Sequence, residues 1–130
     1  MYRDTPPTDQ EAAVRTLAMP KDTNGLGDIF GGWLMSHADI AGAVSAYRRA
    51  GGRVVTVAVK EFEFLEPVYV GDLVSFYADI ERVGDTSVTV DVTVFSARSE
   101  GAEEQHVKVA QARLVYVHVG DDRRPKSIKK

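Results

Sequence analysis

Four long β-prone runs follow one another in the second half of this chain, after a single long apolar helix. The runs are rich in β-branched and aromatic residues, and short turns marked by Gly, Pro and Asp separate them. Successive strands with short connections favour an antiparallel sheet, and one helix with such a sheet defines an α+β fold. The predicted strands are residues 53–64, 73–83, 87–97 and 106–119, and a mixed run at 12–19 could form a first strand.

The run 87–97 has the most regular alternation in the chain. Valine occupies positions 88, 90, 92 and 94, whereas Thr89, Asp91 and Thr93 lie between the valines. This pattern predicts a half-buried antiparallel strand whose valine face points to the core. We expect the polar stretch 98–105 to form the loop that follows.

Strands of ten or more residues are longer than usual and suit a strongly curved sheet. We expect this sheet to curl around the apolar helix. A long strand at the edge of a sheet exposes unpaired backbone groups. The chain is therefore expected to form a homodimer through its edge strands.

The helix is predicted to begin at Gly31, after a loop at 20–28 that contains Pro and several Gly. Small and apolar side chains recur there at steps of three and four. Between Trp33 and Tyr47 they occupy most of the helix surface, so we expect protein to cover most sides of the helix. Glycines after Ala50 end it.

Length and composition indicate one globular domain, 1–130, with loose termini at 1–11 and 120–130. The absence of cysteine excludes disulfides and a cysteine nucleophile, and it fits a cytoplasmic location. The N-terminal residues lack the apolar core of a signal peptide, and no apolar run reaches membrane-spanning length. A formal net charge of −3 argues against general binding of nucleic acid.

The last eight residues nevertheless carry five basic side chains. One interpretation is a solvated, frayed tail. The other is a clamp for a polyanion such as a nucleotide phosphate. The basic residues are Arg123, Arg124, Lys126, Lys129 and Lys130.

Asp39 is the first candidate for catalysis. Aspartate is a poor residue for a helix interior, and Asp39 lies too far from the helix start to cap it. Its neighbours three and four positions away are small or apolar, which leaves the carboxylate open to close approach. One interpretation is an exposed aspartate beside Ser36 and His37. The other is a carboxylate at the floor of a cleft that acts as a general base.

Asp28 and the pair Gly31 and Gly32 lie at the helix start. Asp28 could cap the helix or form an Asx turn, and it could also position a water molecule. The glycines could form a simple turn, or they could present bare amides and the positive end of the helix dipole to a carbonyl oxygen. Asp39, two turns further along, can face the same point. A carboxylate and backbone N–H donors that face one point are the smallest set of groups that acyl transfer to water requires.

Other catalytic motifs are absent from the sequence. No GxSxG motif is present, which argues against a nucleophile-elbow serine hydrolase. His37, His106 and His118 lack metal-ligand spacing, so no metal is expected. Neither a Walker A motif nor GxGxxG between a strand and a helix occurs.

Three segments carry long contiguous motifs: TLAMPKDTNGLGDIFGGWLMSHADIAGAV at 16–44, GRVVTVAV at 52–59 and FLEPVYVGD at 64–72. Together they closely resemble the YciA-type acyl-CoA thioesterases, which belong with the brain-type acyl-CoA hydrolases to the hotdog-fold group. The resemblance runs from about residue 14 to residue 119. It implies a long central helix wrapped by a curved antiparallel sheet of about five strands. It also implies dimers joined edge to edge, usually as a trimer of dimers, with sites at the dimer interface.

The resemblance further implies roles for individual residues. The family's catalytic aspartate matches Asp39, as a general base on water or as a nucleophile that forms a transient anhydride. Asp28 is implied to orient water or the thioester across the dimer interface, and Gly32, with Gly31, to polarise the thioester carbonyl. Asn24 matches a loop position and is a weaker candidate. The residues implied to bind coenzyme A are Arg53, Val54, Val55, Thr56 and Ser87.

The implied activity is hydrolysis of fatty acyl-CoA to free acid and CoA. No cofactor is expected, since CoA is part of substrate and product. Thioesters resonate poorly, so a general base and one oxyanion donor could suffice. A hydratase or dehydratase of the same fold would need a histidine–carboxylate pair that the loop before the helix lacks. A non-catalytic acyl-CoA sensor or carrier is the other alternative, and the presence of both Asp28 and Asp39 argues against it.

Overall fold

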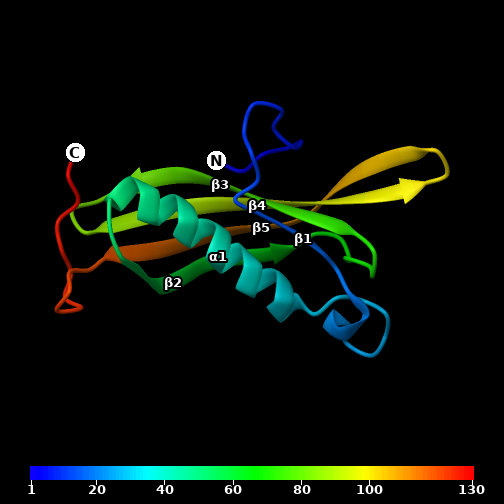
Figure 1. The fold of residues 1–130 in the computed structure, drawn as a ribbon, viewed down its shortest axis with the longest axis horizontal. Coiled ribbons are helices and arrows are strands. Elements are labelled where there is room, and N and C mark those ends of the chain that lie inside the picture. Colours follow the sequence, from blue (N-terminus) through cyan, green and yellow to red (C-terminus); the bar gives the residue numbers. More distant parts are fainter.

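The computed structural model describes the backbone of residues 1–130 and every side chain except that of Glu100. One long helix packs on a single five-stranded antiparallel sheet (Figure 1). The strand order β1-β3-β4-β5-β2 makes β1 and β2 the edges of the sheet. The predicted α+β fold, with a long helix on an antiparallel sheet of five strands, is confirmed. The elements are β1 (Val14–Leu17), a 3₁₀ turn (Pro20–Asp22), α1 (Gly31–Ala50), β2 (Val54–Phe64), β3 (Leu73–Val83), β4 (Ser87–Glu100) and β5 (Glu103–His118).

Helix α1 begins and ends where the sequence predicts. Gly51 ends it in the left-handed region, with a φ of 78°, and its N–H donates to the carbonyl of Tyr47. One side of the helix packs on the sheet, where Leu34 and Ala38 are buried. The opposite side stays open, since Ile40 and Tyr47 are 50% and 58% exposed. The expectation that protein covers most sides of the helix is wrong for a single copy, because the sheet reaches only one side.

The inward faces of the central strands form the core beneath α1. All four alternating valines of β4 are fully buried, as the alternation predicts. On the outer face, however, Asp91 and Thr93 are also fully buried, so the prediction of a half-buried strand is wrong there. The N-terminal segment covers this face. The N–H of Arg3 donates to the hydroxyl of Thr93 (3.0 Å), and the Arg3 guanidinium donates to Asp79.

Strands β4 and β5 continue past their predicted ends as a hairpin that projects from the sheet (Figure 1, yellow). The pairing continues through Arg98 with Gln105 and Ser99 with Glu104. Gly101, with a φ of 66°, makes the turn. The predicted loop at 98–105 is therefore wrong, because cross-strand pairing satisfies the backbone groups of this polar stretch.

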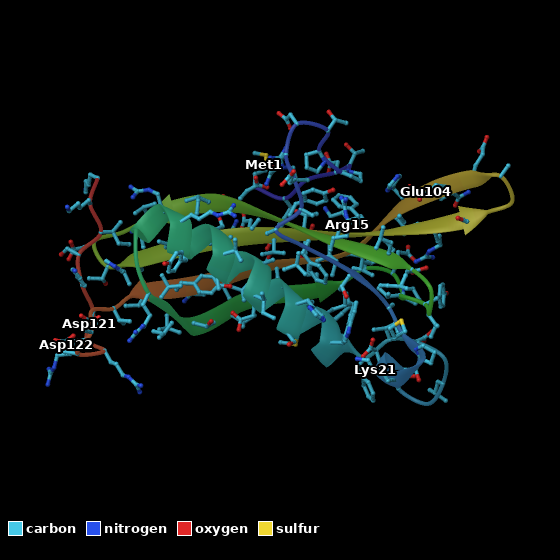
Figure 2. The ribbon with its side chains drawn as sticks, in the orientation of Figure 1. Met1, Arg15, Lys21, Glu104, Asp121 and Asp122 are labelled. Carbon is cyan, nitrogen blue, oxygen red and sulfur yellow. The ribbon has the colours of Figure 1, made fainter. Side chains whose placement is uncertain are left out.

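The residues after β5 return to the sheet. Ile128 is 5% exposed and its N–H donates to the carbonyl of Asp85, and the N–H of Lys126 donates to the carbonyl of His118. Figure 2 shows Asp121, in this C-terminal turn, and Lys21, in the loop before α1, at opposite ends of the molecule. None of the helices described here is both long and apolar enough to cross a bilayer.

Candidate active site

Asp39 lies half-buried in the middle of α1. Its Oδ1 accepts a hydrogen bond from the Thr56 hydroxyl at 2.7 Å and lies 3.1 Å from the hydroxyl of Tyr116. The other carboxylate oxygen, Oδ2, has no hydrogen-bond partner in the part of the chain that the structure describes. The carboxylate is therefore held at one oxygen and available at the other, which is not the geometry of a merely solvated helix residue.

Tyr116 was not among the residues that the sequence singled out. It points inward from β5 and is fully buried, and its hydroxyl donates to the main-chain carbonyl of Asp39 at 2.7 Å. Burial first, and then the charge of Asp39, raise the pKa of Tyr116 well above its usual range, so the hydroxyl keeps its proton and acts as a donor. A signal was present in Gly42, because a glycine inside a helix often marks a close approach.

Asp28, Asn24 and Gly31 come together in a second region, a pocket of about 380 Å³ at the start of α1. The N-cap of the helix is Phe30, and no side chain caps it. The interpretation of Asp28 as the helix cap is therefore wrong, because the helix begins two residues later than a cap at this position requires. The backbone of Asp28 forms an isolated bridge with Tyr69, and its half-buried carboxylate is left for another role.

The N–H groups of Gly31 and Gly32 have no acceptor among the described residues. A Cβ at Gly31 would lie 3.1 Å from the ring of Phe64, whereas nothing lies within 4 Å of a Cβ at Gly32. A side chain at Gly31 would therefore crowd the ring of Phe64, whereas Gly32 leaves an open approach to the amides. Free donors at the positive end of a helix dipole suit a developing oxyanion. Asn24 is less available to a substrate, because its Oδ1 already accepts a hydrogen bond from the N–H of Leu26 at 2.9 Å.

The structure does not bring Asp28 and Asp39 together within one copy of the chain. Eight positions of helix separate Gly31 from Asp39, about 12 Å along the axis. The expectation that Asp39 and the groups at the start of α1 face the same point is therefore wrong for a single chain.

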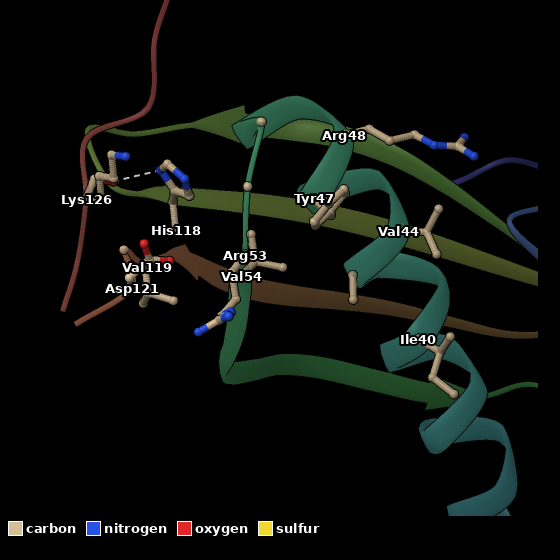
Figure 3. Close-up of a pocket in the computed structure, with 14 residues that line it drawn as sticks. Ile40, Val44, Tyr47, Arg48, Arg53, Val54, His118, Val119, Asp121 and Lys126 are labelled. Carbon is tan, nitrogen blue, oxygen red and sulfur yellow. Dashed lines mark hydrogen bonds between the residues drawn. The ribbon is translucent and has the colours of Figure 1, made fainter. Parts of the chain in front are cut away.

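Arg53 and Val54 lie near the other end of α1, in a pocket of about 800 Å³ (Figure 3). In this pocket the Nδ1 of His118 lies 3.1 Å from the carbonyl of Lys126, which accepts its proton. Three basic side chains and one carboxylate give the lining a positive balance, which suits an anionic group. These charged residues are Arg48, Arg53, Lys126 and Asp121.

Val55 and Ser87 lie at this same end of the sheet. Each pairs with Val117 of β5, one from either side, so the three residues form a row across β2, β5 and β4. Thr56, the next residue of β2, pairs with Tyr116 and reaches Asp39 instead. Four of the five residues implied to bind coenzyme A therefore gather at one end of the sheet, and Thr56 belongs with the catalytic candidate.

The described residues offer no group of three or more His, Asp or Glu side chains that could hold a metal ion. His37 packs edge-on against Trp33, with ring centroids 4.6 Å apart. Burial lowers the pKa of His37, which favours its neutral ring. Its surroundings are those of a packed side chain.

Comparison with known proteins identifies the family. The profile of the Thioesterase superfamily matches residues 26–103. The acyl-CoA thioester hydrolase YciA of Salmonella typhimurium is 47% identical over 120 residues, which cover 91% of this chain and 90% of that protein. The chain belongs to the YciA family of acyl-CoA thioester hydrolases.

Solved structures agree with membership of the YciA family. A hexameric hotdog fold thioesterase of Campylobacter jejuni superposes with a TM-score of 0.90 at 37% identity, over 95% of this chain and 93% of that one. An acyl-CoA hydrolase from Staphylococcus aureus, solved in complex with butyryl coenzyme A and coenzyme A, gives a TM-score of 0.81 at 30% identity. That match covers 88% of this chain and 69% of the Staphylococcus chain.

Alanine variants of the Staphylococcus aureus hydrolase replace an asparagine, an aspartate and a threonine. The asparagine precedes the aspartate by 15 positions and the threonine follows it by 17. In this YciA-family chain Asn24, Asp39 and Thr56 have the same two separations. The same residue types thus recur at the same spacing in both proteins.

Proposed function

We propose that this YciA-family chain hydrolyses fatty acyl-CoA to free acid and CoA, with Asp39 as its catalytic carboxylate. The proposal rests on the hydrogen-bond contacts of Asp39. Its Oδ1 lies within hydrogen-bond distance of the hydroxyls of Thr56 and Tyr116, whereas Oδ2 is left available for water or the substrate. The names of the Salmonella and Staphylococcus relatives support acyl-CoA as the substrate class. The spacing shared with the Staphylococcus variants supports Asp39 and Thr56 as the residues involved.

Two routes are open to the free Oδ2. As a general base, Asp39 takes a proton from water while the water oxygen attacks the thioester carbonyl carbon. The C–S bond then breaks, and the proton passes to the departing CoA thiolate. As a nucleophile, Oδ2 itself attacks, the CoA thiolate leaves, and water hydrolyses the resulting anhydride. In either route the amides of Gly31 and Gly32 stabilise the oxyanion.

A single turnover in ¹⁸O-labelled water tests for the anhydride route. Attack of labelled water on the Asp39 carbonyl of an anhydride places ¹⁸O in the enzyme, where mass spectrometry of the peptide containing Asp39 detects it. The general-base route places the label only in the fatty acid. Labelled Asp39 would therefore exclude the general-base route.

The proposed site lies between two copies of the chain. The helix rise of about 12 Å between positions 31 and 39 supports this arrangement. Edge strand β2 also exposes apolar side chains, with Val55, Val57 and Val59 between 44% and 54% exposed. Pairing of β2 with β2 of a second copy would cover them and satisfy the edge. The hexameric relative from Campylobacter supports an assembly of three such dimers.

The positive pocket at the end of α1 is proposed to hold the phosphate groups of CoA. Arg53 and Lys126 line it, and the buried Ile128 anchors the C-terminal segment beside it. For Lys126, this favours the interpretation of the basic tail as a clamp for a nucleotide phosphate over that of a solvated tail. The segment of β2 from Val54, which lines this pocket, to Thr56 then leads toward Asp39, and the pantetheine arm is proposed to follow it.

The replacement Asp39→Asn tests the proposal. CoA release from short, medium and long acyl-CoAs is followed with a thiol reagent, and the variant is expected to lose at least about 100-fold in kcat. Asp9→Asn, at an exposed carboxylate, is the matched control and should keep wild-type activity. Equal rates for Asp39→Asn and wild type would remove Asp39 from the chemistry. Tight acyl-CoA binding by the wild type without turnover would instead support a sensor or carrier.

Mixed oligomers test the shared site. Asp28→Asn and Asp39→Asn are each expected to be inactive alone, because each removes one half of every site. Co-expressed, they should recover up to about a quarter of wild-type activity, since random pairing makes half of the dimers mixed and each mixed dimer keeps one intact site. No recovery in purified mixed dimers would contradict a site built from two copies.

A further inference from the structure

Tyr116 contacts both the backbone and the side chain of Asp39. The tyrosine lies on β5, 77 residues away in sequence, and its ring is fully buried beneath the helix. Its hydroxyl lies 2.7 Å from the main-chain carbonyl of Asp39 and 3.1 Å from Oδ1 of the same residue. One hydroxyl is thus within reach of both the backbone and the carboxylate of the residue proposed to be catalytic.

Gly42 makes this contact possible. A Cβ built on Gly42 would overlap the Tyr116 hydroxyl and lie 2.9 Å from the ring carbon Cζ. The tyrosine therefore occupies the space that any other side chain would take at this position of α1. Since Gly42 follows Asp39 by three positions, it lies on the same side of the helix, one turn further along. A glycine usually weakens a helix interior, and here the gap that it leaves admits the hydroxyl.

The two hydroxyl donors approach Asp39 from different strands. Thr56 of β2 and Tyr116 of β5 are directly paired in the sheet, so their side chains share the inner face. Both reach Oδ1, and neither reaches Oδ2. The Tyr116 hydroxyl has one proton, which it shares between the Asp39 carbonyl at 2.7 Å and Oδ1 at 3.1 Å. Its weaker branch to Oδ1 adds to the hydrogen bond from Thr56 and further restricts rotation of the carboxylate.

We infer that Tyr116 is a positioning residue for Asp39, whose hydroxyl fixes the carboxylate so that Oδ2 faces water or the thioester. This inference rests on the proposed catalytic role of Asp39. A purely structural tyrosine is the competing explanation, because a buried hydroxyl needs an acceptor and the carbonyl of Asp39 supplies one. The two explanations differ in what removal of the hydroxyl does to turnover.

The variant Tyr116→Phe removes the hydroxyl and keeps the ring. We expect kcat to fall by about 3- to 10-fold, the worth of one hydrogen bond, with little change in KM and a retained cooperative unfolding transition. Tyr77→Phe is the matched control, since Tyr77 is a buried strand tyrosine on the outer face whose hydroxyl contacts Arg15. It should keep the wild-type kcat. A wild-type kcat for Tyr116→Phe would overturn the inference.

Gly42→Ala gives an independent variant. Its methyl group is expected to push the hydroxyl away from Asp39 and to lower kcat. Combining Gly42→Ala with Tyr116→Phe relieves the overlap with the hydroxyl, so the two losses should be less than multiplicative. Fully multiplicative losses would mean that glycine and tyrosine do not act through the same contact, which contradicts the inference.

The background Asp39→Asn separates failure of this inference from failure of the proposed function. If Tyr116 acts through Asp39, Tyr116→Phe should change the residual rate of Asp39→Asn by less than about twofold. An Asp39→Asn variant with the wild-type kcat would overturn the proposed catalytic role of Asp39, on which this inference rests. An inactive Asp39→Asn together with an unaffected Tyr116→Phe would overturn only the role of Tyr116.

Discussion

The hydroxyl of Thr56 donates a 2.7 Å hydrogen bond to Oδ1 of Asp39 and so joins the edge strand β2 to the middle of α1. Immediately after Thr56 the pairing of β2 with β5 shifts by one residue, and it shifts again after Val59. Bulges of this kind bend an edge strand and redirect its side chains, and they are common beside active sites. The contact therefore couples the shape of the exposed edge to the orientation of the carboxylate.

Replacement of Thr56 by valine tests this coupling. Thr56→Val keeps the β-branched shape but removes the donor, so we expect kcat to fall about tenfold, with a smaller change in KM. Thr56→Ser retains the hydroxyl and should retain most of the activity. Thr89→Val, at a half-buried threonine on the outer face of β4, is the control. A large rise in KM with kcat unchanged would instead assign Thr56 to binding of coenzyme A.

The two glycines at the start of α1 should respond differently to alanine. Neither has a positive φ, and a Cβ at Gly32 meets nothing within 4 Å in one copy of the chain. Gly32→Ala should therefore raise the melting temperature by about 2–4 °C, because alanine restricts the unfolded chain. It should nevertheless lower kcat, since the methyl group covers the amides proposed to bind the oxyanion.

Gly31→Ala is the comparison for Gly32→Ala. Its Cβ would lie 3.1 Å from the ring of Phe64, so the ring must move and the gain in stability should be smaller or absent. Melting temperature and kcat are measured for both variants. Unchanged kcat in Gly32→Ala would place the oxyanion elsewhere.

Lys126 is expected to matter for the nucleotide end of the substrate and not for the chemistry. Lys126→Ala should raise KM for acyl-CoA by about 3- to 5-fold at low salt, less at high salt, and leave kcat unchanged. An acyl-N-acetylcysteamine thioester lacks the phosphates, so its KM should not respond. Lys129→Ala, which removes a basic side chain outside the pocket lining, is the matched control. An equal effect on both substrates would argue against a phosphate contact.

Local patterns sufficed for the framework of the fold. The bounds of β3 follow from the turn residues on either side of it, and those of α1 from helical spacing and the glycines after Ala50. All of these signals act over a few residues. The outer face of β4 did not follow, because the segment that covers Thr93 comes from Arg3, 90 positions away. The polar residues after 97 were misassigned because polarity alone does not distinguish an extended hairpin from a loop.

In the site, too, local sequence patterns identify some residues, and only long-range packing identifies the others. Asp39 stood out because a helix interior disfavours aspartate, and Thr56 entered through the resemblance, but their contact depends on how β2 packs beneath α1. In the sequence, nothing distinguishes Tyr116 from the other inward-facing residues of its strand. Its function depends on an acceptor on another element, and only the closely packed Gly42 connects the two.

Acid should destabilise the protein through Asp91. Burial alone would raise the pKa of this carboxyl, but hydrogen bonds from Arg113, at 2.7 and 3.1 Å, help to hold it below its usual range. A carboxyl with a lowered pKa in the folded state stabilises that state above its unfolded pKa of about 3.9, and this stabilisation is lost as the pH falls through the folded value. The melting temperature of the wild type should therefore exceed that of Asp91→Asn at pH 7, and the difference should shrink below about pH 4. Asp4→Asn, at an exposed carboxylate, should show no such difference at either pH. A gap between wild type and Asp91→Asn that stays constant down to pH 3 would show that ionisation of Asp91 does not stabilise the fold.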